Sequence, residues 1–451
     1  MKLKKIKFGQ YRNLKEFECG FGDSNVIAFI GNNGSGKSNV LEAIAQSFAI
    51  AKNIDSIKYI DYLFDMEYEI DGNLYRIENN NSAFHCYKNG RADIKNLRYF
   101  LPKVIFTYYA GDTDRLNSYA KRIEDDRFNR ELKKDEDIDF KMITDLSLKD
   151  FSIAFLASYI FNTDCFAKIK EMLNFDSVNE HRIRIKLKRP YWASAGSSVK
   201  NLWNAKEGSF TDIFYNKLLS YDEEEYGSGA FVELIREEDE FVLGAGSIEL
   251  LREIAKTPLE LYTQLKVFME ADVLDEILID VRKGEDSFPL TLFSEGEKQL
   301  ANLLLLLDLT KEYKALFLLD EFDSYLHPTW QREFVKLINN TDIRGQIIFT
   351  THSPASISKV QRENVFIMKN GEVFQPLSDT FNRSLEEIME EQMEISLRPP
   401  EYTELVQEFR NAIMHNNRNL ALAKLDQIKE VVGENDPFFI TARIALERME
   451  S

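Results

Sequence analysis

The segment Gly31-Asn-Asn-Gly34-Ser-Gly36-Lys37-Ser38 decides the fold of this chain. It follows the apolar run Val26-Ile-Ala-Phe-Ile30, which predicts a buried strand, and it precedes residues 38–52, where apolar side chains recur at helical spacing. Glycines in such a loop let backbone N–H groups turn around an anion at the start of the helix. Because the GxxxxGKS spacing is intact and correctly flanked, the segment predicts a phosphate-binding P-loop rather than a structural turn.

The side chains of this loop predict how a nucleotide and its metal would be held. Lys37 would bring a positive charge to the β- and γ-phosphates, and the Ser38 hydroxyl would be a Mg²⁺ ligand. The candidate nucleotide-binding residues of the loop and the first helical turn are Asn32, Asn33, Gly34, Ser35, Gly36, Lys37, Ser38 and Asn39.

A second apolar run, Ala315–Leu319, ends in the adjacent carboxylates Asp320 and Glu321. Asp320 would hold Mg²⁺ through its water shell, and Glu321 would polarise an attacking water as general base. Buried strands often end in acidic residues, so this segment carries little information alone. Downstream of a P-loop, it predicts the second half of a nucleotide-hydrolysing site.

The segment Phe293-Ser294-Glu-Gly296-Glu297-Lys-Gln299 lies just before a helix that we expect to begin near Leu300. Ser294 and Glu297 have the spacing of a capping box, which satisfies the first N–H groups of a helix. A helix start bearing a serine and a glycine is also an anion site, and it could grip the γ-phosphate of a nucleotide held elsewhere. This segment alone leaves both interpretations open.

The run Ile347-Ile-Phe-Thr-Thr351 predicts the next parallel strand, with residues 330–337 as the crossover helix. His352 follows that strand directly. A lone histidine at a strand end is more often a structural hydrogen-bonding group than a catalytic one. Ligands of such sheets bind at the carboxyl ends of the strands, however, and that is where His352 falls.

The rest of the chain predicts an α/β fold with an inserted and an appended segment. Two hairpins, with turns at Asp71-Gly72 and Asn89-Gly90, indicate an antiparallel lobe closed by a strand at 103–109. A mixed-sheet head would then hold a compact, mostly helical insert, with one clear strand at 181–189 and an acidic loop at 221–229. The predicted parts are residues 1–112 and 273–377 for the head, 113–272 for the insert and 378–451 for a C-terminal helical extension.

Charge limits the partners. The 451 residues include 75 acidic and 57 basic side chains, for a net charge of -18. Such a surface repels nucleic acid except at a local basic patch, and it suits a basic protein partner. Two stretches are candidates for that patch, Arg182–Lys188 and Lys2–Lys7. Arg182–Lys188 alternates basic and aliphatic residues, which favours the solvated face of an edge strand over a phosphate-contacting stripe.

The sequence also predicts the compartment. The charged start Met1-Lys-Leu-Lys-Lys-Ile-Lys does not have the pattern of a signal peptide, and the longest apolar run, Leu303–Leu307, is much shorter than a membrane span. Cys19, Cys86 and Cys165 have neither disulfide nor zinc spacing. We therefore expect a protein of the reducing cytoplasm, with buried cysteines and no membrane segment.

The four segments, in this order, resemble the Walker A, signature, Walker B and switch-histidine motifs of ABC-class ATPases. Phe8–Asn13 followed by the P-loop is similar to the start of the RecF, SMC and Rad50 heads. Residues 320–328 and 350–354 resemble more narrowly the bacterial AAA-15 and AAA-21 ATPases. The tail is similar to that of PtuA-type ATPases of Septu and retron antiphage systems, through the segments 385–388, 398–399, 419–425 and 433–437.

This resemblance implies an ATPase that uses ATP and Mg²⁺, with Glu321, His352 and Lys37 as catalytic residues. Two copies would pair head to tail, alone or within a larger assembly, with ATP between one P-loop and the other copy's Ser294 and Gly296. Asp323 would lie at the dimer contact, and His352 would sense the γ-phosphate. The resemblance also implies a contribution to nucleotide binding from Arg12, Glu297 and Asp323.

One departure concerns the glutamine that ABC heads usually carry after the strand closing the first lobe. Here the segment reads Tyr108-Tyr-Ala-Gly-Asp112, with no glutamine nearby. Asp112 or a water would have to replace it, or catalysis is slow.

Three functions fit an ATPase of this kind. The first is an antiphage defence subunit that controls a separate nuclease or other effector, because no nuclease site is recognisable in the chain. The second is a RecF-like, ATP-gated DNA-repair factor. The third, a transporter ATPase, is disfavoured by the large insert and the missing glutamine.

Overall fold

The computed structural model describes residues 1–53, 61–80, 83–93, 95–110, 143–189, 231–235, 240–244, 251–253, 255–270, 273–313, 315–339, 345–376, 379–381, 400–415, 417–433, 436 and 438–448. These residues belong to two compact units, Met1–Asn382 and Arg383–Ser451, and each unit is described by itself. The domain limits predicted near residues 112 and 377, and the acidic loop at 221–229, lie outside the described residues.

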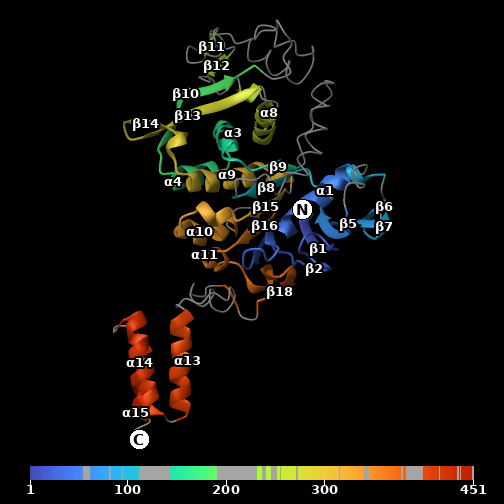
Figure 1. The fold of residues 1–451 in the computed structure, drawn as a ribbon. Helices are drawn as coiled ribbons and strands as arrows, with labels where there is room; N and C mark the ends of the chain where they lie inside the picture. Colours follow the sequence, from blue (N-terminus) through green and yellow to red (C-terminus); the bar gives the residue numbers. More distant parts are fainter. Residues whose placement is uncertain are drawn as a thin grey trace. The chain divides into compact units, whose positions relative to one another are not determined.

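A seven-stranded sheet forms the centre of the first unit, in the order β18-β17-β3-β16-β15-β8-β9 (Figure 1). All neighbouring strands are parallel except β17 and β18. The strands are β3 (Val26–Ile30), β8 (Ile105–Tyr109), β9 (Ile143–Asp145), β15 (Leu316–Asp320), β16 (Gln346–Thr351), β17 (Val365–Lys369) and β18 (Glu372–Phe374). The apolar runs of β3, β15 and β16 are buried throughout, as expected for central parallel strands.

A second, antiparallel sheet forms the lobe, in the order β2-β1-β4-β5-β6-β7. Its strands are β1 (Lys2–Phe8), β2 (Phe17–Gly20), β4 (Phe64–Ile70), β5 (Asn73–Asn80), β6 (Ala83–Lys88) and β7 (Arg91–Ala92). Both predicted turns are confirmed, since Asp71-Gly72 and Asn89-Gly90 have positive φ at both positions. The prediction that residues 103–109 close this lobe is wrong: β8 pairs in parallel with β15 of the central sheet.

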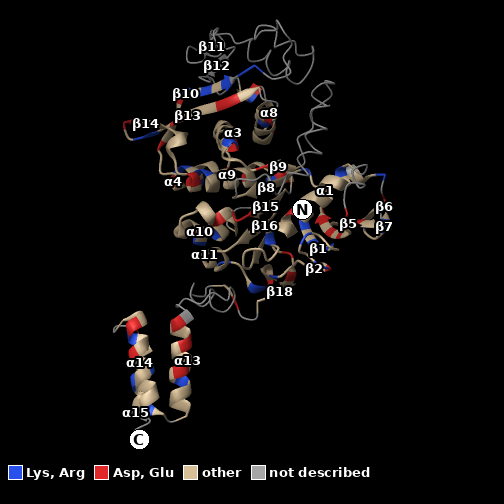
Figure 2. Ribbon diagram, in the orientation of Figure 1, with Lys and Arg blue, Asp and Glu red and all other residues tan. Residues whose placement is uncertain are grey.

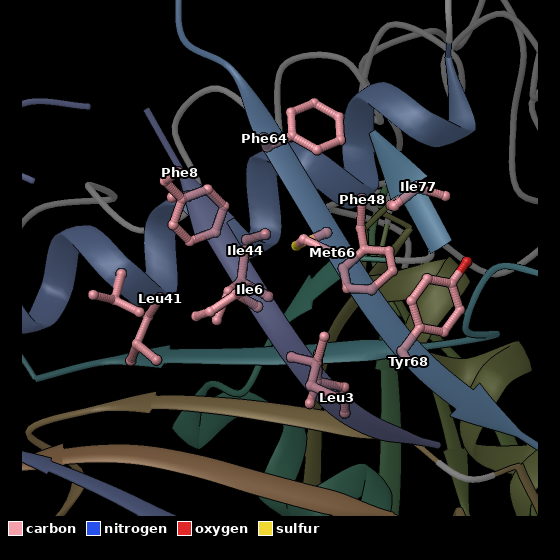
Figure 3. Packing of buried hydrophobic residues seen from close by; sticks show 14 of the residues in the cluster. Leu3, Ile6, Phe8, Leu41, Ile44, Phe48, Phe64, Met66, Tyr68 and Ile77 are labelled. Carbon is pink, nitrogen blue, oxygen red and sulfur yellow. The ribbon is translucent and has the colours of Figure 1, made fainter. Parts of the chain in front are cut away.

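Helix α1 (Lys37–Lys52) packs between the two sheets, and almost all of its side chains are buried. Figure 3 shows Leu41, Ile44 and Phe48 of this helix beside the apolar side chains of β1 and β4. The same cluster includes Phe29 of β3 and Leu318 of β15. The P-loop at the start of α1 therefore sits on a helix held from both sides.

The remaining elements of the head follow the central strands. They are the helices α9 (Glu295–Leu309), α10 (Pro328–Asn339) and α11 (Pro354–Ile357), and the 3-10 turns η2 (Leu97–Tyr99), η4 (Leu290–Leu292), η5 (Lys311–Tyr313), η6 (Phe322–Tyr325) and η7 (Arg362–Asn364). Helix α10 is the predicted crossover. Helix α9 begins five residues before the predicted start near Leu300, because Ser294 caps it.

The insert combines helices with a five-stranded antiparallel sheet. In the part of the insert that the structure describes, the helices are α3 (Leu148–Phe161), α4 (Phe166–Met172) and α8 (Pro258–Glu270), and the sheet order is β11-β12-β10-β13-β14. The strands are β10 (Ser177–Leu187), β11 (Phe231–Ile235), β12 (Glu240–Gly244), β13 (Leu274–Lys283) and β14 (Asp286–Pro289). The predicted strand at 181–189 corresponds to β10. The sequence did not predict β11 and β12, nor that β13 pairs with both β10 and β14.

The alternating basic stretch lies on β10, which is the middle strand of this sheet. The prediction that it forms an edge strand is therefore wrong. Figure 2 shows basic segments of β10 beside acidic segments of β13. Lys186 and Lys188 approach Asp275 at 3.8 and 3.4 Å, and Arg182 approaches Asp280 at 4.0 Å. The stripe is largely neutralised by its neighbour.

A buried ion pair lies where the insert meets the head. Lys266 of α8 donates to Asp150 of α3 at 2.5 Å, and both side chains are almost fully buried. Burial alone would lower the pKa of Lys266, but the charges of Asp150 and Glu270 raise it above its ordinary value. Asp150 also completes the capping box of α3 by accepting from the Ser147 N–H. The pair joins two helices of the insert in the interior.

The described residues of the second unit form the helices α13 (Pro400–Met414), α14 (Arg418–Val432) and α15 (Phe438–Arg448), in agreement with the helical tail that the sequence predicts. Their common core includes Phe409, Ala421 and Ile428. Gly433 ends α14 with a positive φ, and Asp436 caps α15 by accepting from the Phe438 N–H. Both boundaries thus have residues that commonly end and start helices.

All three cysteines are buried free thiols. In the part of the chain that the structure describes, no helix is both long enough and apolar enough to cross a membrane.

Candidate nucleotide-binding site

The strand order brings the predicted site residues to one edge of the central sheet. Strand β16 lies between β3 and β15, with Thr351 paired to Ile30. On the other side of β15, Asp320 is paired to Tyr109 of β8. The carboxyl ends of these strands are therefore level, and the residues that follow them meet at a common edge.

The P-loop connects β3 to α1 and folds around the Lys37 ammonium. Lys37 Nζ donates to the carbonyl oxygens of Gly31 at 2.9 Å and Asn32 at 3.3 Å. Burial lowers the pKa of Lys37, while the charges of Glu321 and Asp320 oppose that shift. Asn32, Asn33 and Gly34 are exposed at the tip of the loop. The loop thus presents its backbone outwards and keeps a cation at its centre.

Gly31 is a glycine because nothing larger fits. Its φ is +148°, and a Cβ there would lie 2.3 Å from the Met368 carbonyl oxygen of β17. The other side of the loop is held by the turn after β17, where the Gly371 N–H donates to the Ser35 carbonyl at 2.9 Å. The buried Ser35 hydroxyl has no hydrogen-bond partner in the described chain, as expected for a group that serves a phosphate oxygen.

Asp320 is fully buried at the end of β15. The Thr350 hydroxyl donates to its Oδ1 at 2.5 Å, while Oδ2 is buried with no hydrogen-bond partner among the described residues. Burial raises the pKa of Asp320, and the hydroxyls of Thr350 and Ser38 partly offset this shift. An unpartnered carboxylate oxygen beside a serine hydroxyl is a set of hard oxygen donors that fits Mg²⁺. Asp320 and Ser38 are thus brought together as predicted.

A chain of contacts at the carboxyl edge of the central sheet runs from Lys37 through His352 to Glu321. Lys37 Nζ lies 2.9 Å from His352 Nε2, which lies 3.4 Å from a carboxylate oxygen of Glu321. Burial and then the Lys37 charge lower the pKa of His352, which favours the neutral ring. Glu321 has a left-handed backbone with a φ of 51°, and its N–H donates to the Thr350 hydroxyl at 3.0 Å. Such strain at a non-glycine residue commonly marks functional sites.

The signature helix α9 has the predicted capping box. The Ser294 hydroxyl donates to Glu297 at 2.7 Å, and the Glu297 N–H donates back to that hydroxyl at 3.3 Å. Ser294 is exposed, and its hydrogen bonds in the described chain all lie within its own helix start. The structure therefore establishes the cap, and among the described residues Ser294 makes no hydrogen bond to the P-loop of the same chain.

Gly296 has a packing role that the sequence did not reveal. A Cβ at this position would lie 2.7 Å from the Tyr325 carbonyl oxygen, so only glycine allows α9 to approach η6. Gln299 of the same helix donates to the Phe322 carbonyl at 2.7 Å. The signature helix thus rests directly on the turn that follows Asp320 and Glu321.

Asp323 lies in η6, the turn that follows β15. Its carboxylate is buried, and it accepts hydrogen bonds from the hydroxyls of Thr351 and Ser356. Burial raises its pKa, and those hydroxyls offset the shift. Asp323 therefore ties the turn after β15 to the segment that carries His352, and its place at a dimer contact stays a prediction.

Arg12 and Asn13 lie in the turn between β1 and β2, beside the P-loop. Arg12 pairs with the buried Glu42 of α1 at 2.5 Å and keeps about two fifths of its side chain exposed. Asn13, which the sequence did not single out, donates to the Gly34 carbonyl at 2.7 Å and accepts from Asn39 at 2.6 Å. Asn13 thereby joins the tip of the loop to the first turn of α1. In the sequence it is the last residue of Phe8–Asn13, the segment that resembles the start of RecF, SMC and Rad50 heads, but no role was assigned to it.

The segment that lacks the usual glutamine is held by aromatic contacts. Tyr108 packs edge-on against Phe322, and burial raises its pKa to about 12. The Tyr325 hydroxyl donates to the Ala110 carbonyl at 3.0 Å. Asp112, the expected substitute, lies outside the described residues.

The central sheet, the antiparallel lobe and the grouped Lys37, Asp320, Glu321 and His352 define an ABC-type P-loop NTPase head. Residues 26–358 match the family model AAA_21, described as "AAA domain, putative AbiEii toxin, Type IV TA system". This match spans well over half of the chain, so the protein belongs to that family.

Three proteins align with parts of this chain. It is 25% identical over 417 residues to "Retron Vc95 probable ATPase" of Vibrio cholerae serotype O1 biovar El Tor, covering 85% of this chain and 76% of that protein. It is 29% identical over 153 residues to "Retron Ec83 probable ATPase" of Escherichia coli, covering 31% and 28%. It is 31% identical over 120 residues to "Septu protein PtuA" of Bacillus thuringiensis, covering 24% and 29%. The alignments therefore span less than a third of the Ec83 protein and of PtuA.

Solved structures of related shape include an SMC head domain from Thermotoga maritima and a complex of the recombination mediator RecF. Each is 17% identical, with a TM-score of 0.36, and the similarity covers 83% and 84% of this chain and 98% of each of the others. Likeness at this level carries no conclusion about function.

Proposed function

We propose that this protein binds and hydrolyses ATP, and that it does so as a subunit of an antiphage defence complex. The observation that carries the first part is the contact chain from Lys37 through His352 to Glu321. The Lys37 ammonium, the His352 imidazole and the Glu321 carboxylate lie together at the end of the P-loop. The buried Asp320, a candidate metal ligand, directly precedes Glu321 in the chain. These are the groups that phosphoryl transfer to water requires.

Each residue has a role that follows from its place. Lys37 leaves His352 and contacts the phosphates, which are cradled by the backbone N–H groups of the loop. Ser38 and Asp320 would hold Mg²⁺, which when bound neutralises charge on the phosphates. Glu321 orients a water and accepts its proton, while His352 is placed to hydrogen-bond the γ-phosphate.

The signature helix completes the site in a second copy of the chain. The start of α9 is exposed and already capped, and Ser294 makes no bond to its own P-loop. A helix N-terminus with exposed N–H groups attracts anions. Head-to-tail pairing would place Ser294, Gly296 and Glu297 of one copy over the ATP of the other. A dimer, or a larger assembly built from dimers, is the proposed working form.

The defence role rests on the names of the relatives. Two are called retron ATPases and the third a Septu protein. In the described chain no cluster of three or more histidine, cysteine, aspartate or glutamate side chains could hold a metal ion. We therefore place the effector, such as a small nuclease, on a separate polypeptide that the ATPase cycle restrains or releases.

Replacing Glu321 with glutamine tests the assignment of the base. The variant keeps the size of the side chain but cannot accept a proton, so phosphate release should fall by about 10²- to 10⁴-fold. ATP affinity should persist, and the ATP-bound dimer should accumulate in sedimentation experiments. Glu333→Gln on the exposed face of α10 is the matched control and should retain full turnover. Unchanged turnover in Glu321→Gln would refute the assignment.

Affinity capture from cells that carry the neighbouring genes tests the defence role separately. We expect a second protein, encoded beside this one, to be retained with the ATPase and to have nuclease or other toxic activity. Recovery of the ATPase alone would contradict the proposed complex and leave the hydrolysis assignment intact.

A further inference from the structure

Gln331 is a polar side chain close to the nucleotide site to which no role has yet been given. It lies in the first turn of α10, the helix that follows the turn η6. Helix α10 packs against α11, which begins two residues after His352 (Figure 1). Glu321 directly precedes η6, so the proposed base and the proposed γ-phosphate contact belong to the two segments beside this helix.

Among the described residues, the side-chain amide of Gln331 makes three hydrogen bonds. Its Nε2 donates to the carbonyl oxygens of Asp323 at 2.8 Å and of Leu326 at 3.1 Å, both in or directly after η6. Its Oε1 accepts from the Ser353 hydroxyl at 2.8 Å. A glutamine amide offers two donors and one acceptor to these groups, whereas a glutamate carboxylate has no proton to donate to the carbonyls.

The bond to Ser353 holds the residue that follows His352. The Ser353 N–H donates to the Thr351 hydroxyl at 2.7 Å, and that hydroxyl donates to the Asp323 carboxylate at 2.5 Å. The residues on both sides of His352 are therefore bonded to η6, one directly and the other through Gln331.

The positions of the two reacting side chains depend on the segments that carry them. Side-chain exposure is 37% for His352 and 38% for Glu321, so packing alone does not fix either group. The distance of 3.4 Å between the His352 ring nitrogen and the Glu321 carboxylate spans the two segments. Because Gln331 bonds to both of them, its amide sets how far apart they lie.

We propose that Gln331 is a positioning residue that holds the His352 ring beside the Glu321 carboxylate. This inference rests on the proposed function, because it assigns Gln331 to the same hydrolytic site. Loss of the amide leaves the P-loop and both reacting side chains in the protein but releases the segment after His352. A misplacement of about 1 Å can lower a rate on the order of 100-fold, so the chemical step should suffer.

The variant Gln331→Met tests the proposal in the full-length chain. Methionine has nearly the same length and shape but cannot make the three hydrogen bonds. The kcat of phosphate release should fall about tenfold or more, with the KM for ATP changed less than about twofold, because Lys37 and its loop are untouched. In a His352→Ala background the same substitution should not lower kcat further, because the side chain that Gln331 positions is absent.

Gln346→Met is the matched control. Gln346 lies at the other end of β16, where its amide accepts from the Leu3 N–H at 2.7 Å and donates to the Ser24 carbonyl at 3.2 Å. This substitution also removes hydrogen bonds of a glutamine side chain. It should lower the melting temperature and leave kcat unchanged, since these bonds lie away from the carboxyl edge of the sheet.

A second measurement needs no hydrolysis, so it also decides for variants whose turnover is too slow to follow. The chain has five histidines, and ¹⁵N labelling of histidine therefore gives few ring signals by nuclear magnetic resonance. His352→Ala identifies the signals of the His352 ring. Gln331→Met should shift or broaden them in the nucleotide-free protein, and Gln346→Met should leave them in place.

The outcomes separate this proposal from the proposed function. A fall in kcat that is absent from the His352→Ala background, together with a changed His352 signal, supports it. An equal proportional fall in both backgrounds, or a His352 signal that Gln331→Met leaves unchanged, overturns it, because Gln331 would then act only on stability. A wild-type chain that does not hydrolyse ATP would refute the proposed function, and the His352 signal would still decide whether Gln331 positions the ring.

Discussion

Charged residues behave differently in the central sheet and in the sheet of the insert. At the carboxyl edge of the central sheet, Asp320 Oδ2 and the Ser35 hydroxyl are buried without a partner among the described residues. In the insert, β10 and β13 carry opposite charges that face each other across the strands. The central sheet therefore has buried polar atoms that a ligand could bind. In the insert sheet, the charged side chains of neighbouring strands pair with each other.

This difference separates a binding site from a charged surface. An unpartnered buried oxygen costs free energy, so it persists where a ligand or metal supplies the missing bond. Paired surface charges cost little and contribute little. The number of charged residues in a stretch of sequence does not distinguish a binding site from a charged surface. The hydrogen-bond and ion-pair partners of each charged side chain in the structure do.

The largest expected effect on ATP affinity is that of Lys37→Ala. The variant removes the only cation inside the loop, and charge-assisted contacts to phosphate are strong, so ATP affinity should fall on the order of 100-fold. Equilibrium titration with a fluorescent ATP analogue measures the change. Lys186→Ala in the insert sheet removes an equal charge and should leave ATP affinity unaltered. Equal loss in both would show that net charge, not the loop, governs binding.

Breaking the buried ion pair between Lys266 and Asp150 should lower the stability of the protein strongly. Lys266→Met leaves the carboxylate of Asp150 buried and unpaired, which should lower the free energy of unfolding by about 3–5 kcal/mol. Thermal or urea unfolding followed by circular dichroism measures the loss. The second substitution Asp150→Asn should recover part of it, since no buried charge then remains. A loss below about 1 kcal/mol would mean that solvent reaches the pair.

Asn13 should affect nucleotide binding more than the chemical step. Asn13→Ala removes the bonds to Gly34 and Asn39, so the KM for ATP should rise about tenfold with little change in kcat. Asn13→Asp keeps the acceptor for Asn39 and loses the donor to Gly34, and it should give an intermediate KM. Steady-state phosphate release measures both constants. A fall in kcat without a change in KM would place Asn13 in the reaction itself.

The smallest effect is expected on the surface of the insert. Lys186 is paired at 3.8 and 3.9 Å with Asp275 and Glu276 and is partly exposed. Lys186→Ala should therefore change the free energy of unfolding by about 0.5 kcal/mol or less. Denaturant unfolding measures this change in the free energy of unfolding. A loss of several kcal/mol would contradict the conclusion that the paired charges of the insert sheet contribute little to stability.

The sequence predicted the head well because local patterns there coincide with the fold. The P-loop, the acidic strand end and the segment ending at His352 each combine a buried strand with a polar terminus, and parallel pairing brings those ends together. The caps at Ser294, Gly433 and Asp436 also act locally. Such features depend on a few neighbouring residues, so one sequence suffices to find them.

The sequence did not predict features that depend on contacts between residues far apart in the chain. Strand β8 was assigned to the lobe because its pairing with β15 joins segments about 200 residues apart, and no local pattern reports that pairing. The acidic partners of β10 lie on β13, which follows almost 100 positions later. The hydrogen bonds of Asp323 to Thr351 and Ser356 likewise join residues about 30 positions apart, and no local pattern predicts them. Asn13 went unnoticed since its partners belong to other elements.

The measurement that tests the central claim most directly mixes two inactive variants, Lys37→Ala and Ser294→Arg. If the triphosphate is held by the P-loop of one copy and the signature helix of another, a mixed pair contains one intact site. Random pairing then predicts recovery of roughly a quarter of the wild-type rate of phosphate release. If each chain builds its whole site alone, the mixture will stay as inactive as its components.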